Sequence, residues 1–176
     1  MRQDEHLFST LYHELRRIAD AHLRGADRDL TLSPTMLIHE AWLGISSRPE
    51  LDFPDRAHFL AYAARAMRGI VIDYARQSRA QKRGGGAFQI TLVPELSASA
   101  VGDTDQLARL SDAVDELSAL EPELAALVDL HFFCGYTYAE IAQQRGVSER
   151  TVQRDWRKAR LLLHHALLDD GAQSNA

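Results

Sequence analysis

Residues 138–152 read YAEIAQQRGVSERTV, and this spacing predicts a helix-turn-helix. Ala142 supplies the small side chain needed where two helices press together. Four residues later, Gly146 supplies a turn residue that tolerates a positive φ. Ser148 is placed to cap a second helix. Three apolar residues follow that should bury this second helix against the first: Val147, Val152 and Trp156.

The second helix of this motif carries a dense positive charge. Between residues 145 and 160, six basic residues stand against two acidic ones, a local charge of +4 in a chain whose net charge is −5. Such residues contact base edges and phosphates in the major groove of DNA. We therefore expect a DNA-binding surface formed by Ser148, Glu149, Arg150, Gln153, Arg154, Arg157 and Lys158. The alternative is an ordinary helical hairpin with a solvated basic face.

The remaining sequence predicts helices almost throughout, so the expected fold class is all-α. Apolar residues recur at three- and four-residue steps, and Ser33-Pro34 provides a helix start with its cap. We expect helices at residues 5–23, from Pro34 to about Ile45, at 56–83, at 105–120 and at 122–133, then a helical pair ending near residue 168.

One segment breaks the helical pattern. Gly84-Gly85-Gly86 opens a stretch with little periodicity, which predicts a flexible linker over residues 84–104. The chain is thus expected to form two small helical domains, 1–83 and 105–170, followed by a disordered tail, 171–176.

Composition limits the location and the chemistry. Hydrophobic residues make up 45% of the 176, enough for packed cores, and the net negative charge excludes a protein that coats nucleic acid uniformly. The single cysteine, Cys134, lies in an apolar stretch and is expected to pack in the core of a reduced, cytoplasmic protein. Neither a signal peptide nor an apolar run of roughly 20 residues is seen.

A second group of basic residues lies on the helix at 56–83 and at its end. It comprises Arg65, Arg68, Arg76, Arg79, Lys82 and Arg83, with only Asp73 opposing them. Aromatic residues lie among them, a combination that suits single-stranded DNA because bases stack on rings while cations follow the backbone. Phe59 and Tyr62 are better explained as core residues, which leaves the loop at residues 46–55 to hold an unpaired base.

Enzymatic chemistry is not indicated, and no cofactor is expected. His39-Glu40 has no second histidine at metal-ligand spacing on its helix. Gly84-Gly85-Gly86 lacks the Lys-Ser or Lys-Thr of a phosphate-binding loop and follows a predicted helix instead of a strand.

Three stretches together resemble the bacterial sigma factors of the extracytoplasmic-function (ECF) class, within the sigma-70 family. They are residues 37–43 (LIHEAWL), residues 67–76 (MRGIVIDYAR), and residues 135–142 (GYTYAEIA) with 147–152 (VSERTV). The resemblance spans nearly the whole chain. It implies a region 2-like first domain and a region 4-like second domain, with no middle σ3 domain between them.

The resemblance also implies partners and roles. Leu37, Ile38, His39, Glu40 and Trp42 would bind the β′ clamp coiled coil of core RNA polymerase. Arg65, Arg68, Asp73, Arg76, Arg79, Lys82 and Arg83 would meet the melted −10 element of the promoter. The helix-turn-helix would bind the −35 element and the β flap. Control by an anti-sigma factor or a serine/threonine kinase is a further implication. A helix-turn-helix regulator that acts without polymerase is the main alternative, and a purely protein-binding helical module is another.

This chain departs from the class at the start of its predicted polymerase-binding helix. Members usually carry several carboxylates there, whereas this chain has Ser33, Thr35 and Met36, with Glu40 alone remaining. Phosphorylation of Thr35, or of Ser33, would restore negative charge in a first helical turn, where anions are favoured. The alternative is that Ser33 is only a cap, Thr35 has no special role, and Met36 packs against a divergent partner.

Overall fold

The computed structural model describes residues 3–24, 32–81 and 104–173, and every regular element in these ranges is helical. The expected all-α fold class is therefore confirmed. The linker expected at residues 84–104 lies outside the described residues, except for Thr104, which begins a helix.

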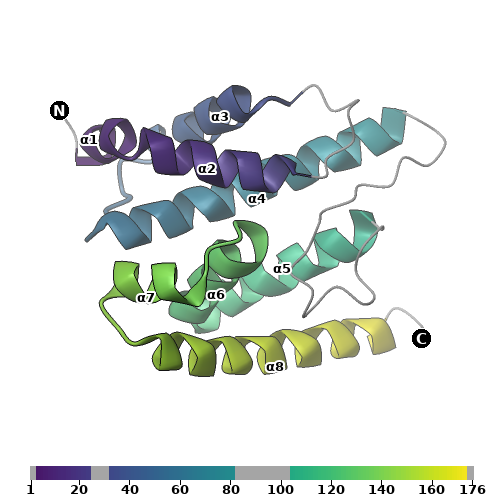
Figure 1. The fold of residues 1–176 in the computed structure, drawn as a ribbon. Helices are drawn as coiled ribbons and strands as arrows, with labels where there is room; N and C mark the ends of the chain where they lie inside the picture. Colours follow the sequence, from purple (N-terminus) through teal and green to yellow (C-terminus); the bar gives the residue numbers. More distant parts are fainter. Residues whose placement is uncertain (1–2, 25–31, 82–103, 174–176) are drawn as a thin grey trace.

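The first helical group contains four helices (Figure 1): α1 (Gln3–Thr10), α2 (Tyr12–Leu23), α3 (Pro34–Ser46) and α4 (Arg56–Gln81). The single helix expected over residues 5–23 is divided at Leu11, whose ψ of 12° departs from α-helical geometry. Just before this point, the Ser9 hydroxyl donates to the carbonyl oxygen of His6 at 3.1 Å, a local bond that favours helix bending. Ser33 caps α3 as expected, because its Oγ accepts from the backbone N–H of Met36 at 3.2 Å.

The second group follows with α5 (Thr104–Leu120), α6 (Pro122–Val128), the π-helical turn η1 (Asp129–Phe133), α7 (Tyr138–Arg145) and α8 (Glu149–Gln173). The helix expected over residues 122–133 changes its winding at Asp129, since the N–H of Cys134 bonds the Asp129 carbonyl five residues back, at 3.1 Å. Helix α8 continues to Gln173, so residues 171–173 of the expected tail are helical, and residues 174–176 lie outside the described part.

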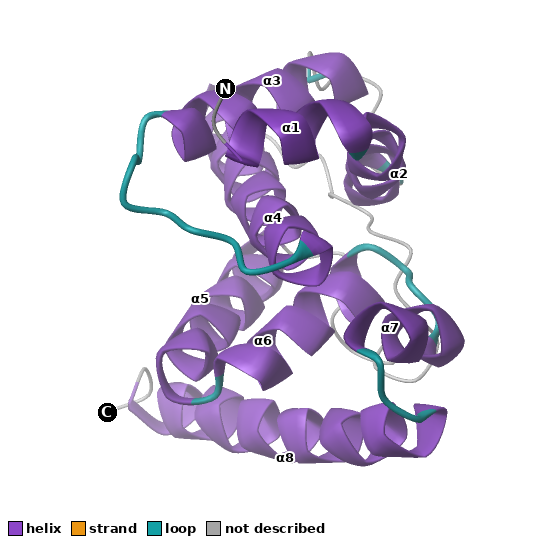
Figure 2. Ribbon diagram, turned by 90° about the vertical axis from the view of Figure 1, so that its left-hand side faces the viewer, coloured by secondary structure: helices purple, strands orange, loops and turns teal. Residues whose placement is uncertain are grey.

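The two groups pack directly on each other. Figures 1 and 2 both show α4 with the other helices of its own group on one side and α5, α6 and α7 on the other. Buried apolar side chains form one continuous core through both groups, from Ile18 and Phe59 in the first to Leu127 and Ile141 in the second. Cys134 is buried in this core, as expected. Because the core is continuous, helix α4 packs against both groups.

Candidate nucleic-acid interface

The helix-turn-helix is built by α7, α8 and the turn between them. Thr137 and Glu140 form a capping box at the start of α7, each side chain accepting from the other's backbone N–H. Gly146 ends α7 in the left-handed region, with φ of 66°, and the N–H of Val147 then bonds the carbonyl of Ala142 at 3.0 Å. The small residue and the glycine thus occupy the positions predicted for them.

Helix α8 also begins as predicted, with one exception. The Ser148 Oγ accepts from the N–H of Thr151 at 3.2 Å, while Val152 and Trp156 are buried. Val147 was expected to be buried with them, but it is 42% exposed. It lies in the turn before the cap, so it does not share the buried face of the helix.

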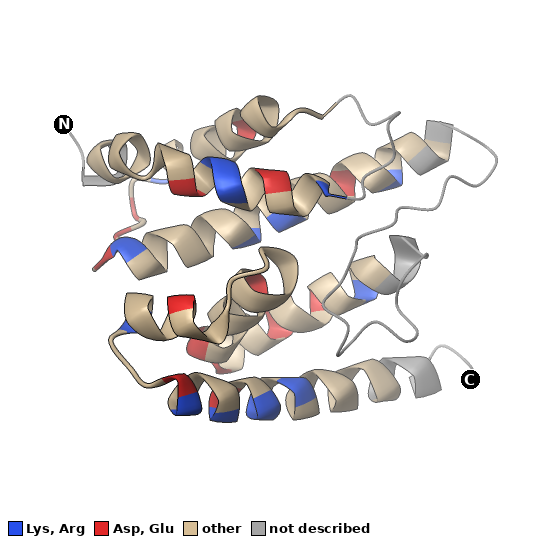
Figure 3. Cartoon of the chain, in the orientation of Figure 1, with Lys and Arg blue, Asp and Glu red and all other residues tan. Residues whose placement is uncertain are grey.

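The predicted −35 surface lies on the outer side of α8 near its start, where Figure 3 shows several basic positions. Gln153 is half-buried, and the other six members are exposed: Ser148, Glu149, Arg150, Arg154, Arg157 and Lys158. The Arg154 side chain is 73% exposed and its Nη2 lies 3.1 Å from the neighbouring Asp155 carboxylate. Lys158 Nζ is paired with Glu121 at 2.6 Å. These exposed cations continue the basic surface along α8 beyond its start, and at the start itself the N–H groups and the helix dipole also favour phosphate.

Arg145 contributed to the local positive charge in the sequence, but it does not join this surface. Its side chain is only 14% exposed, and its Nη2 donates to the backbone carbonyl of Glu123 at 2.9 Å. Burial lowers the pKa of its guanidinium. Arg145 therefore ties α7 to α6.

The residues predicted to meet the −10 element lie on α4, and the structure separates them by exposure. Asp73 and Arg76 are exposed, Arg65 is half-buried and Arg68 is buried, with 2% of its surface exposed. Arg79 lies in α4 without a described side chain, and Lys82 and Arg83 fall outside the described residues. In this conformation Arg68 is inaccessible to DNA.

The Arg68 guanidinium is enclosed by groups from the second helical group. Its Nε donates to Asp129 Oδ1 at 2.7 Å and its Nη2 to Asp115 Oδ1 at 3.0 Å. Its Nη1 donates to both the carbonyl and the hydroxyl of Ser111. Burial raises the pKa of Asp129 to about 6, against the attraction of Arg68. A charge so deeply buried is tolerated because it is paired and hydrogen-bonded.

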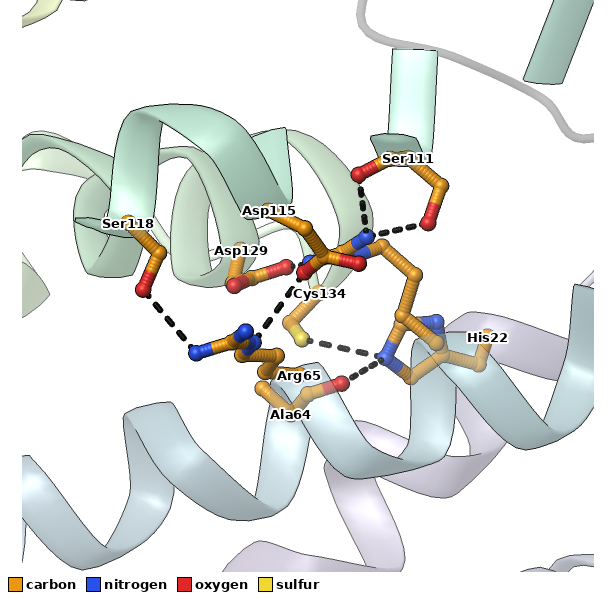
Figure 4. Close-up of polar contacts among 9 residues, drawn as sticks. His22, Ala64, Arg65, Ser111, Asp115, Ser118, Asp129 and Cys134 are labelled. Atoms are coloured by element: carbon orange, nitrogen blue, oxygen red, sulfur yellow. Dashed lines mark hydrogen bonds and ion pairs between the residues drawn. The ribbon is translucent and has the colours of Figure 1, made fainter. Parts of the chain in front are cut away.

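Figure 4 shows the neighbours of this cluster. Arg65 Nη1 donates to the hydroxyl of Ser118 at 2.9 Å, and Arg65 Nε lies 3.1 Å from Asp115. On the other side, the ring of His22 bonds the carbonyl of Ala64 at 3.1 Å, and Cys134 Sγ lies 3.6 Å from the same ring nitrogen. Burial, with the charge of Arg68, lowers the pKa of His22 to about 4.

The predicted polymerase-binding residues of α3 also divide between core and surface. Leu37 and Ile38 are 0% and 2% exposed, so they pack in the core and are inaccessible to a partner. His39 and Glu40 are exposed, and Trp42 is half-buried against Phe8, with ring centroids 4.4 Å apart. The exposed large apolar side chains on this helix are Met36 and Leu43.

The aromatic residues near α4 behave largely as core residues. Phe59 is fully buried and Tyr62 half-buried, as expected. Phe53, from the loop expected to hold an unpaired base, is buried too, with its ring centroid 5.3 Å from that of Phe59 and 5.4 Å from that of Tyr62. In this conformation the Phe53 ring is therefore not available to stack on a base.

In residues 3–24, 32–81 and 104–173, no group of three metal-binding side chains is placed to hold an ion. None of the helices in these ranges is long and apolar enough to cross a membrane.

A capped helix-turn-helix with an exposed basic start, packed on a second helical group with an arginine-rich helix, defines a DNA-binding protein. Residues 2–169 match the family model described as ECF sigma factor, and the chain belongs to this family. It is therefore a non-enzymatic factor that binds core RNA polymerase and promoter DNA and directs transcription initiation. This membership decides against a regulator that acts without polymerase. No curated protein matches the chain in sequence.

Proposed function

We propose that this sigma factor reads two promoter elements, using α8 for the −35 element and α4 for the −10 element. The observation that carries this proposal is the first part of α8, where exposed Arg150, Arg154 and Arg157 follow the Ser148 cap at four- and three-residue steps along one face of the helix. Arginines so placed suit both base edges and phosphates of the major groove. On α4, Asp73 and Arg76 are exposed, while Arg65 and Arg68 would have to leave their carboxylate partners to meet DNA.

The domain division is proposed with it. Residues 1–83 would form the unit that meets the polymerase clamp and the −10 element, and residues 105–170 the unit that meets the −35 element and the β flap. A tether at residues 84–104 would let both units engage elements separated by spacer DNA, so that two weak contacts act as one strong one.

The polymerase-binding surface is proposed to be the outer face of α3. His39 and Glu40 are exposed there between Met36 and Leu43, which are 43% and 48% exposed. Apolar side chains of this size at the surface are typical of protein interfaces when polar groups surround them. Leu37 and Ile38 would act indirectly, by holding α3 against the core.

Run-off transcription with core polymerase, on a library of promoter fragments, tests the proposal and identifies the promoter sequence. Arg154→Ala should lower run-off from the best promoter about tenfold, since one lost arginine–base contact is worth roughly 1–3 kcal/mol. Arg109→Ala is the matched control, because Arg109 is an exposed arginine on α5, outside both proposed DNA surfaces. Equal losses from the two variants, or no association with core polymerase by either the unmodified or the kinase-treated protein, would exclude this assignment.

Phosphorylation of Thr35 is proposed as the activating event. The hydroxyl of Ser33 is already used as the cap of α3, which favours Thr35 as the modified residue. Thr35 is exposed in a first turn that contains no acidic residue, and a phosphate there would gain from the helix dipole. Its Oγ1 also lies 3.4 Å from Nη1 of Arg16, a group that would pair with a phosphate.

Run-off transcription also tests this switch. We expect little activity from Thr35→Ala and restored activity from Thr35→Glu or from kinase-treated protein. Equal transcription by these variants and the unmodified protein would remove the switch, while leaving the promoter-reading assignment intact. Ser33→Ala is the matched control, and it should lose about 1 kcal/mol of stability as a cap variant without losing its response to the kinase.

A further inference from the structure

Helix α8 packs on the protein through one face and leaves the opposite face open. The packed face carries Val152, Trp156, Ala159 and Leu163 at three- and four-residue steps, against α5, α6 and α7. The opposite face lies at the edge of the molecule in both Figure 1 and Figure 2, and none of the described helices lies beyond it. A partner can therefore approach this open face along the helix.

The open face changes its chemistry along α8. Its first part carries the proposed −35 arginines, and Figure 3 shows that the basic positions are confined to that part. Residues 161–168, which follow, contain no lysine, arginine, aspartate or glutamate. In this second part Leu161 and Leu168 are 63% and 60% exposed. Because they are seven residues apart, they lie on one side of the helix, in line with Arg154.

Two exposed histidines, His164 and His165, lie between these leucines. His165 Nδ1 donates to the carbonyl oxygen of Leu161 at 2.9 Å, which holds its ring against the preceding turn. One exposed leucine is ordinary on a protein surface. Two leucines at heptad spacing, with rings between them, form a narrow strip of the kind that pairs with another helix. We call Leu161, His164, His165 and Leu168 the leucine strip.

The leucine strip is symmetric about its own centre. Leu161 precedes the midpoint of His164 and His165 by the same interval by which Leu168 follows it, about 5 Å along the helix axis. A second α8 that runs antiparallel therefore sets Leu161 of each copy against Leu168 of the other. It also brings His165 beside its own counterpart. Such a self-complementary pattern is what a two-fold interface between identical chains requires.

Charge also favours an antiparallel copy. Arg157, Lys158 and Arg160 are exposed on the N-terminal side of the leucine strip. On its C-terminal side the sequence continues with Asp169-Asp170. An antiparallel copy brings these oppositely charged ends to the same level along the pair, whereas a parallel copy would set like charges together. The charge pattern of α8 is thus complementary to itself in one direction only.

We propose that the leucine strip is a weak self-association site, through which two copies of the free factor pair by antiparallel α8 helices. A strip this short buries less than the roughly 1,200 Å² of a stable interface, so pairing is reversible and depends on concentration. Because the strip continues the line of Arg154 and Arg157, a paired α8 occupies space that a DNA duplex needs at those residues. Pairing thus stores the factor in a form that does not read the −35 element. The storage role rests on the proposed −35 function of α8, whereas the pairing does not.

Sedimentation equilibrium of the full-length protein tests the pairing. We expect a reversible monomer–dimer equilibrium at micromolar concentrations. Leu161→Glu should raise its dissociation constant by about tenfold or more, because it sets a charge against Leu168 of the second copy. Leu120→Glu is the matched control, since Leu120 is 81% exposed but lies on α5 outside the strip, and it should leave the constant unchanged. Far-UV circular dichroism verifies that each variant is folded.

Two outcomes would overturn the pairing. One is a protein that stays monomeric at about 100 μM, and the other is a dimer that Leu161→Glu does not weaken. If the protein is monomeric and Leu161→Glu instead loses core polymerase, the leucine strip is a polymerase contact and not a site for a second copy.

Introduced cysteines test the direction of the pair. His165→Cys should form a disulfide between copies about tenfold faster than Leu161→Cys, since an antiparallel pair brings the two 165 positions together and separates the two 161 positions by about 10 Å. Native Cys134 is 1% exposed and does not compete. Faster cross-linking of Leu161→Cys would indicate parallel helices and would overturn the proposed arrangement.

The cross-linked protein then tests the storage role. Reduced His165→Cys should bind a duplex that contains the −35 element as the unaltered protein does, since His165 lies outside the proposed DNA surface. The oxidised dimer should bind it about tenfold more weakly, and reduction should restore binding. Equal binding by the oxidised and reduced forms would overturn the storage role. If Arg154→Ala binds the duplex as well as the unaltered protein, the −35 assignment fails instead, and the sedimentation result still decides the pairing.

Discussion

His22 should make the folded protein sensitive to mild acid. Its ring is buried and neutral, bonded to the Ala64 carbonyl at 3.1 Å, and burial, with the charge of Arg68, lowers its pKa from 6.5 to about 4. Between these two values the unfolded chain binds a proton that the folded protein does not. Stability from His22 is therefore full above pH 6.5 and is lost as the pH falls towards 4.

The expected size follows from the shift. At pH 5, proton binding by His22 favours the unfolded state by a factor of about 30. This lowers the free energy of unfolding by about 2 kcal/mol relative to pH 7.5. In urea, with a denaturant slope of about 2 kcal/mol per molar, the unfolding midpoint should fall by about 1 M.

His22→Gln is the matched variant, because its side-chain amide supplies an N–H for the Ala64 carbonyl and does not titrate. Urea unfolding followed by circular dichroism at pH 7.5 and pH 5 gives the change for each protein. Other acids and histidines titrate in both, so the quantity to compare is the difference between the two proteins. The quantity of interest is the free energy of unfolding of the unaltered protein minus that of His22→Gln. If it changes by less than about 0.5 kcal/mol between pH 7.5 and pH 5, the burial of a neutral His22 is not the cause of acid sensitivity.

Four further substitutions, one of them a comparison variant, test the packing around the sites by urea unfolding at pH 7.5. Asp129→Asn should destabilise the fold by about 3 kcal/mol, because it leaves the buried Arg68 short of one counter-charge. Asp112→Asn, at an exposed ion pair, should change the free energy of unfolding by less than about 0.5 kcal/mol. Similar losses of stability from the two variants would contradict the account of a buried ion pair. Gly146→Ala should cost about 1 kcal/mol through its φ of 66° alone, since a Cβ there meets no atom within 4 Å; an unchanged midpoint would show that the turn relaxes freely. Thr137→Ala should lose about 1 kcal/mol with its capping box, and no loss would mean that water replaces the cap.

The helix-turn-helix could be predicted because its signals are local. Ala142, Gly146 and Ser148 act within one turn and its two flanking helices, and each occupies its predicted position. Helix starts were predictable for the same reason, as with the Ser33 cap. The prediction for Val147 was wrong because its apolar character alone does not show that it precedes the Ser148 cap and therefore lies outside the buried face of α8.

The environment of Arg68 could not be predicted in this way. Its partners Ser111, Asp115 and Asp129 lie 43 to 61 residues further along the chain. An arginine-rich helix has the same sequence whether it meets phosphates or carboxylates, so only the packing of the two groups distinguishes them. The burial of Leu37 was different, because helical spacing already placed it on the apolar face of α3.

The π-helical turn at Asp129–Phe133 determines the directions in which the side chains at the end of this helix point. Loss of one residue after Asp129 would let the helix wind on in the ordinary way, and the side chains from the deletion to the helix end at Cys134 would turn by about 100° around the axis. Cys134 would then no longer keep its orientation relative to Asp129, although no charge had been removed. In this segment the number of residues matters as much as their identity, and a single-residue deletion would alter the fit between the two halves more deeply than most substitutions.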